Sequence, residues 1–124
     1  MIHSFFLINR QGKIRLTKWY IQNLSMEERQ KFIKEINNIV LTRNAKSCNF
    51  LEWNECKIVY KRYASLYFIC VVDKEDNELL VLEIIQYFVE VLDKYFNNVC
   101  ELDLIFNFHK VYYILDEILM AGHI

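Results

Sequence analysis

The chain has 124 residues, of which 54% are hydrophobic and 25% charged, and its formal net charge at pH 7 is −1. This composition excludes a disordered or low-complexity protein, and the length predicts one domain over residues 1–124. Nucleic-acid binding is not expected either, because the phosphate backbone requires clustered cationic side chains that so balanced a charge does not supply.

The N-terminal part predicts a β-hairpin followed by a helix. Residues 2–9 are mostly apolar, residues 13–20 alternate between apolar and polar, and Gly12 between them can adopt the positive φ of a tight turn. Ser25 and Glu28 match a capping box, which predicts that a helix begins here. Its apolar positions at helical spacing are Phe32, Ile33, Ile36, Ile39 and Val40. This helix should therefore cover one face of a sheet and expose its other side to water.

Three β-like stretches follow, at residues 49–53, 58–63 and 66–72. The polar pair Asn54 and Glu55 supplies a turn between the first two. The third stretch is apolar at nearly every position, as expected for a strand that is covered on both faces.

A long helix is expected over residues 78–96, and it is apolar on two stripes. The first stripe is Leu80, Ile84, Tyr87, Phe88, Val91, Leu92 and Tyr95, and the second includes Leu82, Ile85 and Val89. A helix with two apolar faces is either central in its domain or reserves one face for a partner. We expect the second stripe, with Val89, to be the one that the domain's own sheet does not need.

The C-terminal part predicts two further helical segments. Asn98 with Glu101 repeats the capping pattern for a short helix to about residue 107, and a last helix is expected over residues 108–120. The element order is ββαβββαα, with a possible split of the last helix. This order indicates an α+β fold with a five-stranded, antiparallel sheet and helices on it.

The sequence offers no sign of an active site, a metal or a cofactor. The four cysteines (Cys48, Cys56, Cys70, Cys100) form no CxxC pair and lie far from the three histidines, so reduced thiols that serve as small apolar side chains are expected. Cys100 with His109 is the one candidate nucleophile pair, but a cysteine beside Val99 in so apolar a chain is more typical of a core. We therefore predict a protein that is not an enzyme.

The N-terminal residues MIHSFFLINRQGK lack a basic region and a small-residue cleavage site, so a secretory signal is not predicted. The apolar run at residues 64–72 is about half of the roughly 20 residues that a membrane span requires, and it is typical of a strand. Both observations favour a cytosolic location.

Basic side chains recur on two predicted strands, with Lys13 and Arg15 on one and Lys61 and Arg62 on another. They are either an ordinary solvated face of the sheet or a small anion-recognition patch beside apolar surface. Such a patch is too small for nucleic acid, but it could bind acidic peptide side chains or lipid head groups.

Four stretches of the sequence resemble the small (sigma) subunit of heterotetrameric clathrin adaptor complexes. They are NRQGKIRLTKWY at 9–20, FLEWNECKIVYKRYASLYF at 50–68, DNELLVLEII at 76–85 and VCELDLIFNFHKVYYILDE at 99–117. The likeness extends over essentially the whole chain. It implies a longin-like fold, a five-stranded antiparallel sheet between helices, and this agrees with the element order above. It also implies a non-enzymatic subunit that serves vesicle-mediated protein transport.

The resemblance points to one adaptor type more than to another. FLEW, KRYASLYF, DNEL and LDKYF resemble the type one adaptor of the trans-Golgi network and endosomes, whereas NNVCELDL, KVY and MAGHI are closer to the type two adaptor of the plasma membrane. We favour type one and keep type two as the alternative. A longin domain of another trafficking machine, such as a tethering complex or a membrane-fusion protein, is a more distant alternative, and a small enzyme is disfavoured.

The resemblance further implies a binding site for acidic dileucine sorting signals, of the form acidic-x-x-x-Leu-Leu/Ile. The positions that match the family's two apolar pockets are Tyr63, Ala64, Leu66, Val89, Asn98, Val99, Leu102 and Leu104. Arg15 matches the family's arginine that faces the acidic residue of the signal. Taken without the resemblance, Val89 and Leu104 would be ordinary core residues, and Asn98 an ordinary helix cap.

The partners that the resemblance implies are a large subunit whose helical solenoid covers this chain, a second large subunit, and a medium subunit. Cargo-tail peptides would bind directly, whereas the clathrin coat and the membrane would be contacted through the complex. The implied location is the cytoplasmic face of the trans-Golgi network, endosomes and clathrin-coated vesicles, with plasma-membrane coated pits as the alternative.

Overall fold

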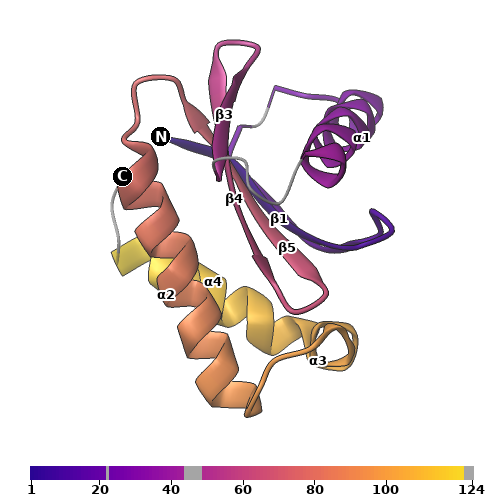
Figure 1. The fold of residues 1–124 in the computed structure, drawn as a ribbon, viewed down its shortest axis with the longest axis vertical. Helices are drawn as coiled ribbons and strands as arrows, with labels where there is room; N and C mark the ends of the chain where they lie inside the picture. The colour runs from indigo at the N-terminus through magenta and orange to yellow at the C-terminus, as the bar shows by residue number, and fades with distance from the viewer. Residues whose placement is uncertain (22, 44–48, 122–124) are drawn as a thin grey trace.

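The computed structural model describes residues 1–21, 23–43 and 49–121 (Figure 1). The strands are β1 (Ile2–Asn9), β2 (Ile14–Trp19), β3 (Phe50–Trp53), β4 (Cys56–Tyr63) and β5 (Leu66–Asp73). The helices are α1 (Met26–Thr42), α2 (Glu78–Phe96), α3 (Glu101–Phe106) and α4 (Phe108–Ala121). The order ββαβββααα confirms the predicted α+β fold, and the last helical segment is split as the pattern allowed.

The five strands form one antiparallel sheet in the order β2-β1-β5-β4-β3. Helix α1 lies against one face of this sheet, while α2 and α4 lie against the other (Figure 1). Strand β5 is therefore central and covered on both sides, and all but one of the side chains from Leu66 to Val72 are buried. The prediction of a doubly covered strand is confirmed.

Two apolar cores lie on the two faces of the sheet, because successive side chains of a strand point to opposite faces. On β1, Phe5 and Leu7 pack on the side of α2 and α4, whereas Phe6 and Ile8 pack on the side of α1. Helix α1 contributes Ile33, Ile36 and Val40 to the second core, as its apolar periodicity predicted. Each such buried side chain stabilises the fold by roughly 1.5–3 kcal/mol.

Local side-chain hydrogen bonds set the end of β1 and the start of α1. The side chain of Asn9 accepts the backbone N–H groups of Gln11 and Lys13, both at 2.9 Å, and Gly12 completes the turn with a φ of +83°. Ser25 and Glu28 form the predicted capping box at the start of α1. These short-range contacts explain why the boundaries of β1 and α1 could be predicted from local patterns.

The buried face of α2 differs from the prediction. The sheet contacts Val81, Ile85, Phe88, Val89 and Leu92, which recur at helical spacing on one face. The second stripe, with Val89, is thus the one that the sheet uses. The exposed face instead carries three residues of the first stripe, Leu80, Tyr87 and Tyr95, which are each more than half exposed, whereas Phe88 and Leu92 of that stripe are buried. The prediction failed because Val81 belonged to neither assigned stripe, although it begins the arc that packs on the sheet.

The connection between α2 and α3 also differs from the prediction. Asn98 does not cap a helix, since it adopts a left-handed φ of 81° directly after Asn97, whose φ is 60°. Helix α3 instead begins after Cys100, whose N–H donates to the carboxylate of Asp103 at 2.9 Å. Two consecutive asparagines tolerate the left-handed conformation better than most residues, so they end α2 and redirect the chain toward α3.

Candidate functional site

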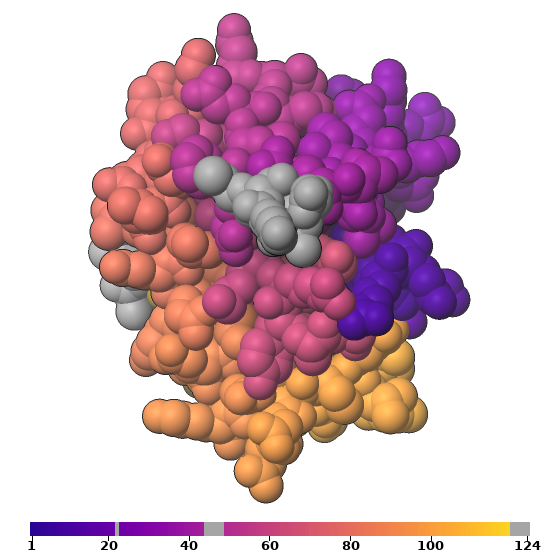
Figure 2. All heavy atoms as spheres, viewed as in Figure 1, coloured from indigo at the N-terminus to yellow at the C-terminus, as the bar shows by residue number. Residues whose placement is uncertain are grey.

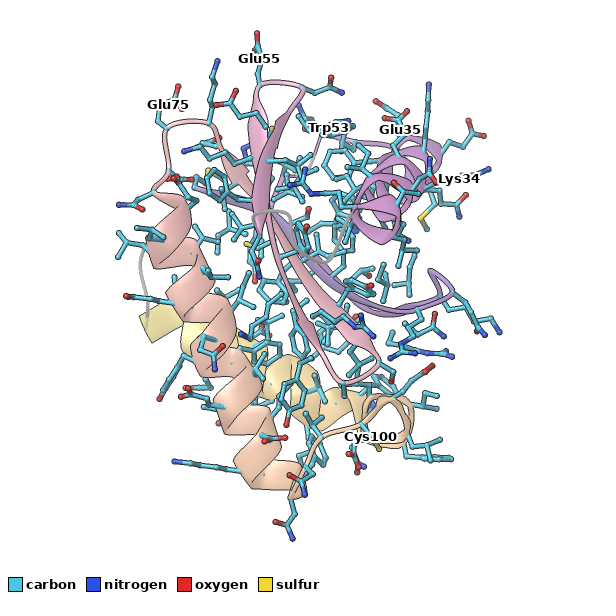
Figure 3. The ribbon with its side chains drawn as sticks, in the orientation of Figure 1. Lys34, Glu35, Trp53, Glu55, Glu75 and Cys100 are labelled. Atoms are coloured by element: carbon cyan, nitrogen blue, oxygen red, sulfur yellow. The ribbon has the colours of Figure 1, made fainter. Side chains whose placement is uncertain are left out.

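The nine residues singled out in the sequence, here called the candidate site, come from five parts of the fold that meet at one end of the molecule. Tyr63, Ala64 and Leu66 lie in and beside the β4–β5 turn, Val89 on α2, Asn98 and Val99 in the α2–α3 connection, Leu102 and Leu104 on α3, and Arg15 on β2. Figure 1 shows the β4–β5 turn, the end of α2 and helix α3 at this same end, and Figure 3 labels Cys100 there.

One carboxylate joins three of these parts. The hydroxyl of Tyr63 donates to Oδ1 of Asp93 at 2.7 Å, and the backbone N–H of Val99 donates to the same oxygen at 3.0 Å. The hydrogen bond to Asp93 raises the pKa of Tyr63 above its usual value. The end of β4, the last turns of α2 and the α2–α3 connection are therefore held in one arrangement. Sequence analysis missed Asp93, although a carboxylate near the end of an apolar helix is a signal for such a contact.

A second carboxylate holds Arg15. The guanidinium Nη2 and Nε of Arg15 both lie 2.8 Å from Oε2 of Glu101, and Nδ2 of Asn9 donates to the same oxygen at 3.1 Å. The hydrogen bonds from Asn9 and Arg15 lower the pKa of Glu101. Both side chains of the ion pair are about three-quarters buried. Sequence analysis placed Arg15 in the site but neither Glu101 nor Asn9, because Glu101 is 86 positions from Arg15 and 92 from Asn9 along the chain.

The apolar residues of the candidate site divide into a floor and a rim. Leu66, Val89, Val99 and Leu104 form the floor, and each is at most 3% exposed. They belong to the core between the sheet and the C-terminal helices. The rim is Ala64, Asn98 and Leu102, which are exposed, and Tyr63, which is half-buried. A ligand side chain can therefore reach the floor only after residues of the rim shift.

Ala64 at the rim has a left-handed backbone with a φ of 55°. Its small side chain leaves the backbone of the β4–β5 turn open to solvent, because the residue is exposed. Leu102 is 59% exposed on the outer side of α3, directly after Glu101. The guanidinium of Arg15 therefore lies beside the turn of α3 that carries the exposed leucine of the rim.

The other predicted cations contribute less to this end of the molecule. Lys13 and Arg62 are exposed and Lys61 is half-buried, and the guanidinium carbon of Arg62 lies 6.0 Å from the ring centre of Tyr67. Charges so exposed are screened by salt and interact with a ligand only weakly. Among these four predicted cations (Lys13, Arg15, Lys61 and Arg62), Arg15 is the one whose position is best defined by its partners.

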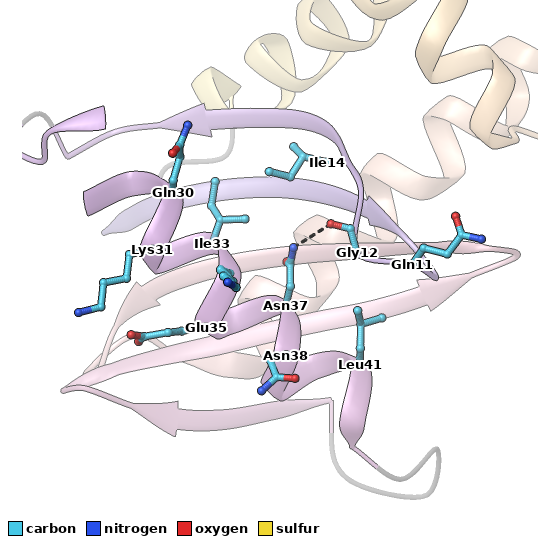
Figure 4. A pocket seen from close by; sticks show the side chains of 11 residues that line it. Gln11, Gly12, Ile14, Gln30, Lys31, Ile33, Glu35, Asn37, Asn38 and Leu41 are labelled. Carbon is cyan, nitrogen blue, oxygen red and sulfur yellow. Dashed lines mark hydrogen bonds between the residues drawn. The ribbon is translucent and has the colours of Figure 1, made fainter. Parts of the chain in front are cut away.

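Two hollows lie elsewhere, and none of the nine residues lines either of them. A groove of about 980 Å³ runs between the β1–β2 turn and α1, where Asn37 donates to the carbonyl of Gly12 at 3.1 Å (Figure 4). A smaller hollow of about 330 Å³ lies between α2 and α4, against Tyr87, Tyr113 and Ile118. The second hollow adjoins the exposed apolar face of α2.

The described residues include no group of three histidine, cysteine or acidic side chains placed to hold a metal ion. Cys56 and Cys70 have no disulfide partner, and Cys48 lies outside the described residues. The sulfur of Cys56 lies 3.5 Å from Nδ1 of His3, but burial raises the pKa of this thiol, which makes it a poor nucleophile. Cys100 is exposed rather than in the core, because it forms the N-cap of α3 at the surface. The described helices include none that is both long and apolar enough to cross a membrane.

Comparison with known proteins assigns the class. The family model described as clathrin adaptor complex small chain matches residues 1–124. A chain of a homology model of the full-length AP-3 complex, in a stretched open conformation, superposes with a TM-score of 0.80 at 32% identity, over 100% of this chain and 84% of that one. The fold and the sequence therefore define a small subunit of an adaptor complex, which has a structural role and is not an enzyme.

Curated relatives narrow the assignment. AP-1 complex subunit sigma-2 of Dictyostelium discoideum is 64% identical over 98% of this chain and 79% of its own length. AP-1 complex subunit sigma-2 of Arabidopsis thaliana is 61% identical over 100% and 76%, and AP-1 complex subunit sigma-1A of Homo sapiens is 56% identical over 100% and 78%. The chain belongs to the clathrin adaptor small-chain family, as a sigma subunit of the AP-1 kind that serves vesicle trafficking. The preference for type one over type two is confirmed.

Proposed function

We propose that this sigma subunit binds acidic dileucine sorting signals of cargo tails at the candidate site. The observation that carries the proposal is the position of Arg15, a cation held by Glu101, the residue that directly precedes the exposed rim residue Leu102. A peptide with an acidic residue several positions before two leucines presents the complementary groups, a carboxylate for Arg15 and two apolar side chains for the floor.

The magnitudes fit a weak and reversible contact. Burying two leucine side chains contributes roughly 1.5–3 kcal/mol each, and a partly exposed ion pair adds up to about 1 kcal/mol. Ordering the peptide and shifting the rim offset part of this gain. The expected dissociation constant is roughly micromolar or weaker, which suits a coat that binds several cargo tails and the membrane at once.

The exposed apolar face of α2 supports a large-subunit partner. Leu79, Leu80, Tyr87 and Tyr95 are each more than half exposed, and α2 lies at the surface of the face seen in Figure 2. With the hollow against Tyr113, they form an apolar surface of the kind that marks a stable interface. We propose that the helical solenoid of one large subunit covers it, in a heterotetramer completed by a second large subunit and a medium subunit.

The proposed location follows from this assembly. As part of an AP-1-type complex, the chain would act on the cytoplasmic face of the trans-Golgi network and endosomes, and on clathrin-coated vesicles. The membrane and the clathrin coat would be contacted through the other subunits rather than by this chain.

The direct test is a binding measurement on the assembled complex. A fluorescent peptide with the sequence pattern Glu-x-x-x-Leu-Leu should bind with roughly micromolar affinity, and the same peptide with both leucines replaced by serine should not. Equal binding of the two peptides would contradict the proposal, because the apolar floor would then play no part.

A further inference from the structure

The contact between Arg15 and Glu101 has a consequence for any acidic ligand of Arg15. Glu101 accepts from Nε and Nη2, the two donors on one edge of the guanidinium, and both contacts measure 2.8 Å. This edge is one of the two that can bind a carboxylate in a bidentate manner. The carboxylate of Glu101 thus occupies a position that a ligand carboxylate could otherwise take.

The same contact reduces the charge that a ligand meets. Arg15 and Glu101 together have no net charge, and their side chains are 24% and 26% exposed, so water screens them less than a fully exposed pair. Lys13, the nearest cation before Arg15 in the sequence, is exposed, so its charge is screened by water and ions. An acidic ligand therefore gains little at Arg15 unless Glu101 moves aside or gives up one donor.

Glu101 is itself held from a second direction. Asn9 donates to Oε2 of Glu101 at 3.1 Å, and the same asparagine accepts two backbone N–H groups of the β1–β2 turn. Asn9 is 6% exposed, so the buried end of β1 fixes its position. The carboxylate is therefore anchored independently of Arg15, and it remains available to recapture the guanidinium when a ligand leaves.

We propose that Glu101 is an internal competitor for Arg15, which weakens the binding of acidic peptides at the candidate site and lowers the preference for an acidic residue over a neutral one. This inference rests on the proposed function, since it concerns the same site. It adds a specificity-determining residue that acts against the ligand rather than with it.

The test uses the assembled complex with Glu101→Gln. The amide keeps the shape of the side chain but removes its charge, so the peptide Glu-x-x-x-Leu-Leu should bind about two- to fivefold more tightly in low salt, as expected for the loss of one partly exposed competing charge. The matched peptide Gln-x-x-x-Leu-Leu should bind as it does to the unmodified complex. The control is Glu75→Gln, which makes the same change of charge at the opposite end of the molecule from Cys100 and should alter neither affinity (Figure 3).

A second variant and a double variant make the outcome decisive. Glu101→Asp keeps the charge but shortens the reach to Arg15, so it should give a smaller gain for the acidic peptide, and it replaces Glu101→Gln if that variant does not assemble. In an Arg15→Ser background, Glu101→Gln should give the acidic peptide a smaller gain, because it then relieves only direct repulsion and frees no guanidinium. A gain as large as in the unmodified background would overturn competition for Arg15. Unchanged or weaker binding of the acidic peptide to Glu101→Gln would overturn the competitor role.

The failures of the two proposals are distinguishable. If the unmodified complex binds Glu-x-x-x-Leu-Leu in a leucine-dependent manner but Glu101→Gln does not strengthen it, the proposed function stands and the competitor role is overturned. If the unmodified complex does not discriminate between the dileucine peptide and its serine version, the proposed function fails and the competitor role fails with it.

Discussion

The hydroxyl of Tyr63 and the carboxylate of Asp93, 30 positions apart in the sequence, form a hydrogen bond of 2.7 Å that joins the end of β4 to the last turns of α2. The same carboxylate oxygen accepts the N–H of Val99. Tyr63, Ala64 and Val99 all belong to the candidate site. The contact with Asp93 therefore sets how the β4–β5 turn is positioned relative to the α2–α3 connection.

Removing that hydroxyl should loosen the site. We expect Tyr63→Phe to lower the melting temperature of the assembled complex slightly and to weaken dileucine-peptide binding by roughly two- to tenfold, the range for one lost hydrogen bond. The control is Glu75→Gln, which changes an exposed side chain outside the candidate site and outside the proposed large-subunit interface. The pKa of Tyr63 is raised in the folded state. The stability that its hydroxyl adds is therefore complete below the usual tyrosine pKa, and it is lost as the pH rises through the raised value. Identical melting of the two variants at neutral pH would contradict this role.

Filling the rim should block the floor. Ala64→Trp places a large ring at the exposed β4–β5 turn, so peptide affinity should fall by about tenfold or more while assembly is retained. The matched control is Asn54→Trp, which puts the same ring at an exposed left-handed position (φ 46°) in the β3–β4 turn. Equal affinities for the two variants would place the peptide elsewhere. Val89→Asp is a poorer test, because Val89 is 2% exposed and a buried carboxylate would destabilise the fold itself.

Arg15 should act through charge. Arg15→Ser is expected to weaken binding of the acidic peptide more at low salt than at high salt, since ions screen the lost attraction over a Debye length of about 10 Å at 0.1 M. Titrations at two salt concentrations measure this difference. A loss of the same size at both would indicate that Arg15 contributes packing rather than electrostatic attraction.

Glu101 should make stability depend on pH in the acidic range. Asn9 and Arg15 lower its pKa in the folded state, so its stabilising contribution is complete above the usual glutamate pKa and is lost as the pH falls through the lowered value. We expect Glu101→Gln to melt at a lower temperature than the unmodified complex near neutral pH. The difference should shrink as the pH is lowered below the usual glutamate value. A difference that does not change with pH would show that Glu101 stabilises the fold by packing alone.

The outer face of α2 should be required for assembly. Tyr87→Asp introduces a charge where the proposed large subunit packs, so co-purification with that subunit should be largely lost. Glu90→Gln changes an exposed side chain of the same helix and serves as the control. Retention of the large subunit by Tyr87→Asp would exclude this face as the interface.

The sequence predicted most element boundaries because local signals set them. Helix α2 covers Glu78–Phe96 as expected, since its apolar pattern begins after a polar segment and ends at two asparagines. The helix α1 begins at its predicted capping box. Both signals act within one or two turns of helix, so no distant contact was needed to interpret them.

The candidate site was less predictable, because distant residues complete it. Arg15 and Glu101 are 86 positions apart, and no local pattern indicates that they meet. The resemblance to a family identified nine positions but not their partners, Asp93, Glu101 and Asn9. It also could not show that the floor residues are buried while Leu102 is exposed.

The amino-acid sequence by itself determined the class of fold, the family and the residue types available for recognition, because periodicity, caps and turns are encoded over short stretches. Only the tertiary structure decided which stripe of α2 faces the sheet, that Asn98 turns the chain rather than capping a helix, and that Glu101 neutralises Arg15. The physical reason is that burial and ion pairing depend on which segments are brought together, and here strand order and helix packing bring together residues from opposite ends of the chain.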